Sequence, residues 1–120
     1  MMKGCNITDS FANAFRGMRR LLGERNMVIH ALSGVAAVAM GFCLDISFGE
    51  WIAVILAIAI VTGAEALNTA IEILSDRVCG DYDEQIKLVK DVAAAGVLIT
   101  AIAASIVGGV IFLPKIISLS

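Results

Sequence analysis

The stretch Glu65-Ala66-Leu67-Asn68-Thr69-Ala70-Ile71-Glu72-Ile73-Leu74-Ser75-Asp76 places acidic and amide side chains in a hydrophobic segment long enough to span a bilayer. An ionised side chain at mid-bilayer costs roughly 2.5 to 3.5 kcal/mol on insertion scales, so such residues usually face a protein interior and serve a function. On a helix with about 100° per residue, positions 65, 68, 72 and 76 fall within an arc of about 80°. The sequence therefore predicts a polar stripe on one helix face, which is typical of a functional site.

The composition is that of a membrane protein. Of 120 residues, 59% are hydrophobic and one is proline, and the mean hydropathy of +0.91 is far above what a soluble domain of this size needs for its core. Three cysteines without paired spacing argue against a disulfide framework. No repeat or second domain is visible, so we expect residues 1–120 to form a single integral-membrane domain.

Three apolar runs, 27–44, 51–74 and 92–113, are each near the ~20 residues that a spanning helix requires. Residues 1–26 carry apolar side chains at helical spacing with arginines largely elsewhere, and Asp9 or Ser10 is expected to cap the start of this helix. The segment is predicted to lie as an amphipathic helix on an anionic membrane surface; the alternative is a helix that packs on the rest of the protein. The expected fold is all-α, with a surface helix and three transmembrane helices.

The distribution of basic residues predicts the orientation. The connection 45–50 holds no Lys or Arg, whereas the N-terminal segment and the loop 77–90 hold most of them, so both should be cytoplasmic. Trp51 would then lie at the outer interface, and Glu65 about 7 Å inside the cytoplasmic boundary. Because three thin spans bury little polar surface, a homo-oligomer is the natural way to keep Glu65 away from lipid.

This arrangement can support phosphoryl transfer. A carboxylate below the headgroups can accept a proton from a lipid hydroxyl, and a second can hold Mg²⁺ that arrives with a nucleotide's phosphates. Lys90, beside Asp91, can neutralise phosphate charge. Intramembrane acids also serve small proton-coupled transporters and channel subunits, which is the alternative function. Phosphate-binding loops and catalytic motifs of soluble kinases are absent from the sequence.

Several segments carry a resemblance to a known family. They are Glu65-Ala-Leu-Asn-Thr-Ala-Ile-Glu72, then Asp76, then Lys90-Asp91-Val-Ala-Ala-Ala-Gly-Val-Leu, and before them Glu24-Arg25-Asn26 with His30. The chain resembles the bacterial integral-membrane diacylglycerol kinases and undecaprenol kinases from about Phe11 to Pro114. The segment between Gly17 and Glu24 is one residue shorter than expected for this family.

The resemblance implies that MgATP phosphorylates a lipid alcohol, undecaprenol or diacylglycerol, at the cytoplasmic side of the bacterial inner membrane. It implies a homotrimer with sites between subunits, and no nucleic acid is expected as a partner. Glu65 corresponds to the catalytic base, and Glu24 and Glu72 correspond to the metal-binding carboxylates. The residues matched to the nucleotide site are Glu24, Asn68, Glu72, Asp76, Lys90 and Asp91.

Two further residues have open roles. Arg16 is a candidate for binding phosphate, with anchoring of the surface helix as the equal alternative, because both uses need a cation at the same depth. His30 lacks a second His or Cys at ligand spacing, so we expect a hydrogen bond at the interface rather than a metal ligand. Undecaprenol is slightly favoured as the substrate, since the segment from Glu24 to His30 resembles the undecaprenol kinase branch more closely.

Overall fold

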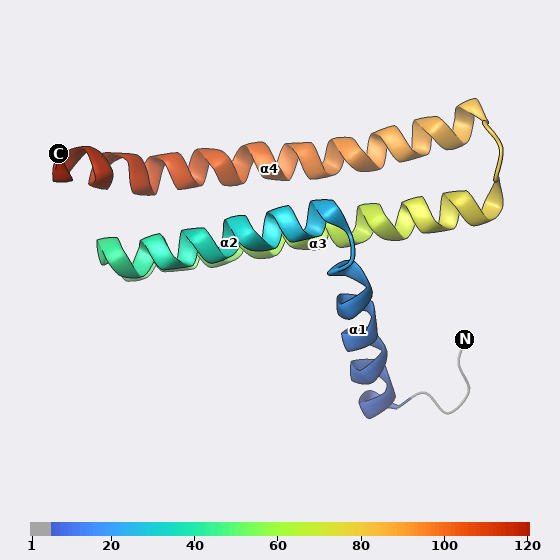
Figure 1. Ribbon diagram of the computed structural model, residues 1–120, viewed down its shortest axis with the longest axis horizontal. Coiled ribbons are helices and arrows are strands. Elements are labelled where there is room, and N and C mark those ends of the chain that lie inside the picture. Colours follow the sequence, from blue (N-terminus) through green and yellow to red (C-terminus); the bar gives the residue numbers. More distant parts are fainter. Residues whose placement is uncertain (1–5) are drawn as a thin grey trace.

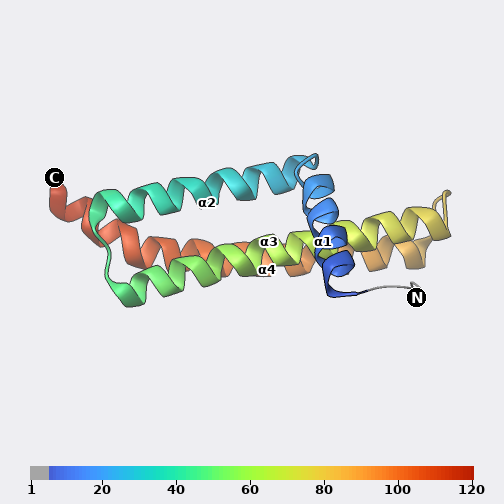
Figure 2. The same cartoon turned by 90° about the horizontal axis from the view of Figure 1, so that it is seen from below.

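The computed structural model describes residues 6–120, which form four helices joined by short connections. They are α1 (Ile7–Leu21), α2 (Arg25–Leu44), α3 (Phe48–Val78) and α4 (Glu84–Leu119). The last three are long and apolar enough to cross a membrane and run alongside one another, whereas α1 projects away across their direction (Figures 1 and 2). The predicted all-α class is confirmed for residues 6–120, and three helices are long and apolar enough to be the predicted spans.

Helix α1 begins one turn earlier than predicted. The side chain of Asn6 caps it by accepting a hydrogen bond of 2.9 Å from the backbone N–H of Asp9. The prediction that Asp9 or Ser10 is the cap is therefore wrong. Asp9 instead lies in the first turn, where its negative charge interacts favourably with the positive end of the helix dipole. No residue of α1 is buried, and Leu21 at its end is half-buried.

The α2–α3 turn joins these two helices at one end of the bundle, which we call the turn end. Ser47 and Glu50 form a reciprocal capping box at the start of α3. Trp51 packs over Gly41, where an added Cβ would lie 2.7 Å from the indole. Lys115 of α4 pairs with Glu50 at 3.2 Å, so all three long helices are connected at this end.

Helices α3 and α4 pack along most of their length and continue past the start of α2 to the loop 79–83, at the opposite, loop end of the bundle (Figure 1). Asp83 caps α4 by accepting hydrogen bonds from the backbone N–H groups of Gln85 and Ile86. The predicted spans 51–74 and 92–113 lie inside longer helices, because hydropathy reports the apolar part of a helix rather than its ends. Helix α4 also continues through Pro114 to Leu119.

Candidate active site

Glu65 is buried between α2 and α3, and only 3% of its surface is exposed. Its two carboxylate oxygens meet different neighbours. The hydroxyl of Thr69, one turn along α3, donates a hydrogen bond of 3.2 Å to Oε2. His30 of α2 places Nε2 3.7 Å from Oε1. The candidate base is therefore enclosed by polar side chains from two helices rather than left facing lipid.

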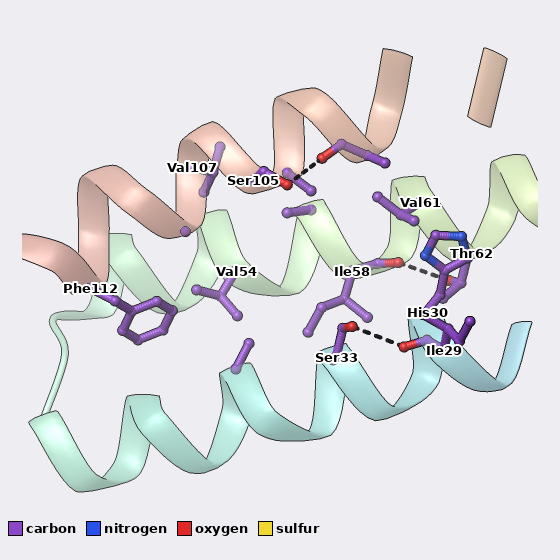
Figure 3. Close-up of a pocket in the computed structure, with 16 residues that line it drawn as sticks. Ile29, His30, Ser33, Val54, Ile58, Val61, Thr62, Ser105, Val107 and Phe112 are labelled. Carbon is purple, nitrogen blue, oxygen red and sulfur yellow. Dashed lines mark hydrogen bonds between the residues drawn. The ribbon is translucent and has the colours of Figure 1, made fainter. Parts of the chain in front are cut away.

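An apolar groove of about 390 Å³ runs between α2, α3 and α4 and reaches His30 at one end and Phe112 at the other (Figure 3). The hydroxyls along it donate to carbonyls of their own helices, as Ser33 does to Ile29, so the wall offers few free polar groups. On α3 the groove extends from Val54 to Thr62, about 12 Å at 1.5 Å per residue. This shape and lining suit a single hydrocarbon chain.

The polar stripe of α3 is buried in one half and exposed in the other. Glu65 and Asn68 are buried, whereas Glu72 and Asp76 are exposed. The cause is the length of α2, which begins at Arg25 and covers α3 only as far as the turns beside Glu65. The Asn68 side-chain oxygen is buried without a hydrogen-bond partner among residues 6–120. A buried amide oxygen without a partner is costly, so a ligand or a cation would be favoured there.

The exposed half of the stripe meets the start of α4. Lys90 places Nζ 2.5 Å from Oδ1 of Asp76, and the charge of Glu72 acts on the same ammonium. Asp91 does not join this group, because it pairs with Lys87 at 2.6 Å. A cavity of about 400 Å³ lies beside these residues, between Asp76, the loop 79–83, Lys87 and Lys90. The lining also includes the carboxylates of Asp81 and Asp83, and each lysine is already paired with an aspartate. Phosphate oxygens would therefore have to share or replace these carboxylates as partners of the two ammonium groups.

The candidate residues of the N-terminal segment lie apart from this group. Glu24 stands directly before α2 and pairs with Arg20 at 2.8 Å. Arg16 hydrogen-bonds Asn13 on α1. Within residues 6–120, no three His, Cys, Asp or Glu side chains come together as a metal-binding group. Mg²⁺ usually takes one or two carboxylates and completes its coordination with phosphates and water, and the exposed Glu72 with the unpartnered Asn68 oxygen fits that donor set.

Sequence reasoning missed two contacts at the site. Thr69 stands four residues after Glu65, which is the spacing at which helix side chains meet, so its hydrogen bond could have been predicted from the sequence. The contact of His30 with Glu65 joins two helices. It depends on the rotation and register of α2 against α3, which no local pattern reveals.

The sequence profile of the prokaryotic diacylglycerol kinases matches residues 12–112, which is most of the chain. The chain belongs to this family. The chain is also similar to an undecaprenol kinase of Bacillus subtilis, to which it is 37% identical over 108 residues that cover 89% of this chain and 88% of the relative.

A diacylglycerol kinase of Synechocystis is 38% identical over 116 residues, covering 95% of this chain and 66% of the relative. Membership of the prokaryotic diacylglycerol kinase family identifies the chain as a membrane lipid kinase with ATP as co-substrate. The family therefore decides between the two functions that the intramembrane acids allowed. It favours the kinase over the proton-coupled transporter.

Proposed function

We propose that this family member transfers the γ-phosphoryl group of MgATP to the hydroxyl of undecaprenol, with diacylglycerol as the alternative acceptor. The observation that carries the proposal is the position of Glu65. This carboxylate is buried where the apolar groove reaches His30, and it lies on the same helix as the Asp76 that holds Lys90. A lipid tail and a nucleotide can thus approach one site from opposite directions.

In the proposed reaction, Glu65 accepts the proton of the lipid hydroxyl as its oxygen bonds to the γ-phosphorus. The bond from that phosphorus to the bridging oxygen breaks, and ADP leaves. Removing the proton makes the oxygen a stronger nucleophile, and a positioned base contributes typically 10² to 10⁴-fold in rate. The tail would lie in the groove with its hydroxyl at the His30 end.

Positive charge on the nucleotide side would come from Lys90, with Lys87 across the same cavity. Glu65 and Asp76 are eleven residues apart on α3, about 16 Å along the axis, and Glu72 lies between them. Phosphates held near Lys90 would therefore extend past Glu72 toward Glu65. Mg²⁺, when bound to Glu72, would draw charge from the phosphate oxygens; Glu24 is the second proposed ligand and Asn68 a polar partner.

The proposed setting is the bacterial inner membrane, with α1, the loop 79–83 and the site cytoplasmic. The basic residues of α1 and of the loop end support this orientation. Phe11, Phe15 and Met18 of α1 are largely exposed, which supports a position on the membrane surface with Arg16 near the lipid phosphates.

A homotrimer is proposed for the same protein. Gly34 and Gly41 are in close contact with neighbouring helices of their own chain, with Ile58 and Trp51 nearest. Gly63 and Gly96 have no such neighbour among the described residues, and α2, α3 and α4 leave most of their surface exposed. Small residues at exposed positions let a helix of a second copy approach closely, which supports an assembly that also covers Glu72.

Undecaprenol is favoured over diacylglycerol because the segment from Glu24 to His30 resembles the undecaprenol kinase branch more closely. The relatives named undecaprenol kinase and diacylglycerol kinase are similar to the chain to the same degree, with identities of 37% and 38%. The test is the ratio of kcat/KM for the two lipids in the same mixed micelles, with phosphorylated lipid as the readout. We expect a ratio in favour of undecaprenol. A ratio that favours diacylglycerol by ten or more, about 1.4 kcal/mol of transition-state preference, would reverse the assignment.

A further inference from the structure

His30 is the one side chain of α2 that pairs with the candidate base. Its Nε2 lies 3.7 Å from Oε1 of Glu65, and 20% of its side chain is exposed against 3% for the glutamate. No Lys or Arg among residues 6–120 lies within ion-pair distance of Glu65. Among residues 6–120, the imidazole of His30 is therefore the group that can act as a cation beside Oε1.

The two carboxylate oxygens of Glu65 have neighbours on different helices. Thr69 is on α3, the helix that also carries Glu65, so its hydrogen bond fixes the carboxylate only relative to its own helix. His30 is on α2, so it relates the carboxylate to the groove wall. Two partners on separate helices restrict rotation of the carboxylate more than either partner alone.

The present separation is longer than a hydrogen bond. An approach of about half an ångström would bring Nε2 and Oε1 to the upper limit for an N–H···O bond, and catalytic hydrogen bonds often tighten only when substrate is present. His30 also lines the end of the groove nearest Glu65 (Figure 3). A tail packed in the groove would contact α2, which can close this gap.

We infer that His30 is a positioning residue, which holds Oε1 of Glu65 so that the carboxylate faces the lipid hydroxyl at the groove end. The inference rests on the proposed function, in which Glu65 is the base. A misplacement of about 1 Å at a reacting group can cost 10²-fold in rate. Loss of the imidazole should therefore lower kcat while nucleotide binding, which takes place further along α3, stays the same.

The experiment compares His30→Leu and His30→Phe, which lack a donor, with His30→Gln, which keeps one. Wild type and Glu65→Gln are assayed in parallel for lipid-dependent ATP turnover. Thr100→Val is the matched control, because the Thr100 hydroxyl donates only to a carbonyl of its own helix. Lipid-dependent turnover in wild type that is lost in Glu65→Gln shows that the proposed function holds, whatever the His30 variants do.

With Glu65 active as the base, we expect kcat to fall about tenfold to a hundredfold in the donor-free variants, with KM for ATP and the melting temperature unchanged. His30→Gln should recover kcat to within about threefold of wild type, and Thr100→Val should match wild type. A kcat for His30→Leu or His30→Phe equal to that of Thr100→Val would overturn the inference, as would a kcat for His30→Gln no higher than that of either donor-free variant.

If neither donor-free variant folds, His30→Asn takes their place in the comparison, since its amide is too short to take the place of Nε2 beside Glu65. A lower kcat than that of His30→Gln supports the positioning role, and an equal kcat rejects it.

Discussion

Lys90 at the start of α4 is held by Asp76 near the end of α3, with Nζ 2.5 Å from Oδ1. The pair spans the two helices at the loop end and fixes one ammonium beside the cavity of the loop 79–83. Because both helices are long and continuously paired, the position of Lys90 follows from their register. The charge that we propose for the nucleotide side is thus part of the α3–α4 hairpin.

Replacement of this ammonium tests its role at the transition state. Lys90→Met should lower kcat at saturating ATP by about 10² to 10³-fold, because a charge that balances the moving phosphoryl group matters most at the top of the barrier. Steady-state kinetics against ATP would measure the effect. Lys115→Met is the control, since it removes a paired lysine at the opposite end of α4. A Lys90→Met variant that only raised KM for ATP would show that Lys90 contributes to binding alone.

The proposed metal ligands should differ in a measurable way. Glu72→Gln is expected to raise the Mg²⁺ concentration needed for half-maximal activity, because it removes an exposed carboxylate beside Lys90. Glu24→Gln should do the same only if Glu24 exchanges its pairing with Arg20 for the metal. Mg²⁺ titrations of both variants and wild type would decide. An unchanged requirement in Glu72→Gln would place the metal on other residues.

Packing at the turn end gives a prediction about stability. Gly41→Ala should destabilise the protein by about 1 to 3 kcal/mol, because its Cβ would meet the Trp51 indole at 2.7 Å and Ile46 at 3.1 Å. Thermal unfolding in detergent would measure the loss. Gly17→Ala, where an added Cβ meets no atom within 4 Å, should not lose stability. Adding Trp51→Phe should restore part of the stability of Gly41→Ala, and no recovery would place the strain elsewhere.

Much of this fold follows from local sequence patterns. The spans at 27–44, 51–74 and 92–113 could be predicted because hydropathy and length act within a single helix. The stripe from Glu65 to Asp76 could be predicted for the same reason, since helical spacing alone aligns its members. The extra turns of α3 and α4 could not, because their polar ends look like loop in a hydropathy pattern.

Contacts between helices could not be predicted from the sequence. The contact of His30 with Glu65 and the close packing of Trp51 on Gly41 each depend on how α2 and α3 are rotated against one another. The pairing of Asp91 with Lys87 is different, because it joins positions four residues apart on α4. The exposure of Glu72 was missed because it depends on where α2 begins. These features decide which residues of the stripe lie close together. The arrangement of the candidate site could therefore be established only from the structure.

The central claim is that Glu65 is the base for the lipid hydroxyl, and the turnover of Glu65→Gln tests it most directly. The amide keeps the shape and removes the basic lone pair, so phosphorylation of the lipid should fall at least a hundredfold. Assembly and melting temperature should stay close to those of wild type, which separates loss of chemistry from loss of fold. A folded Glu65→Gln variant that retained more than about a tenth of wild-type kcat in mixed micelles would contradict the account.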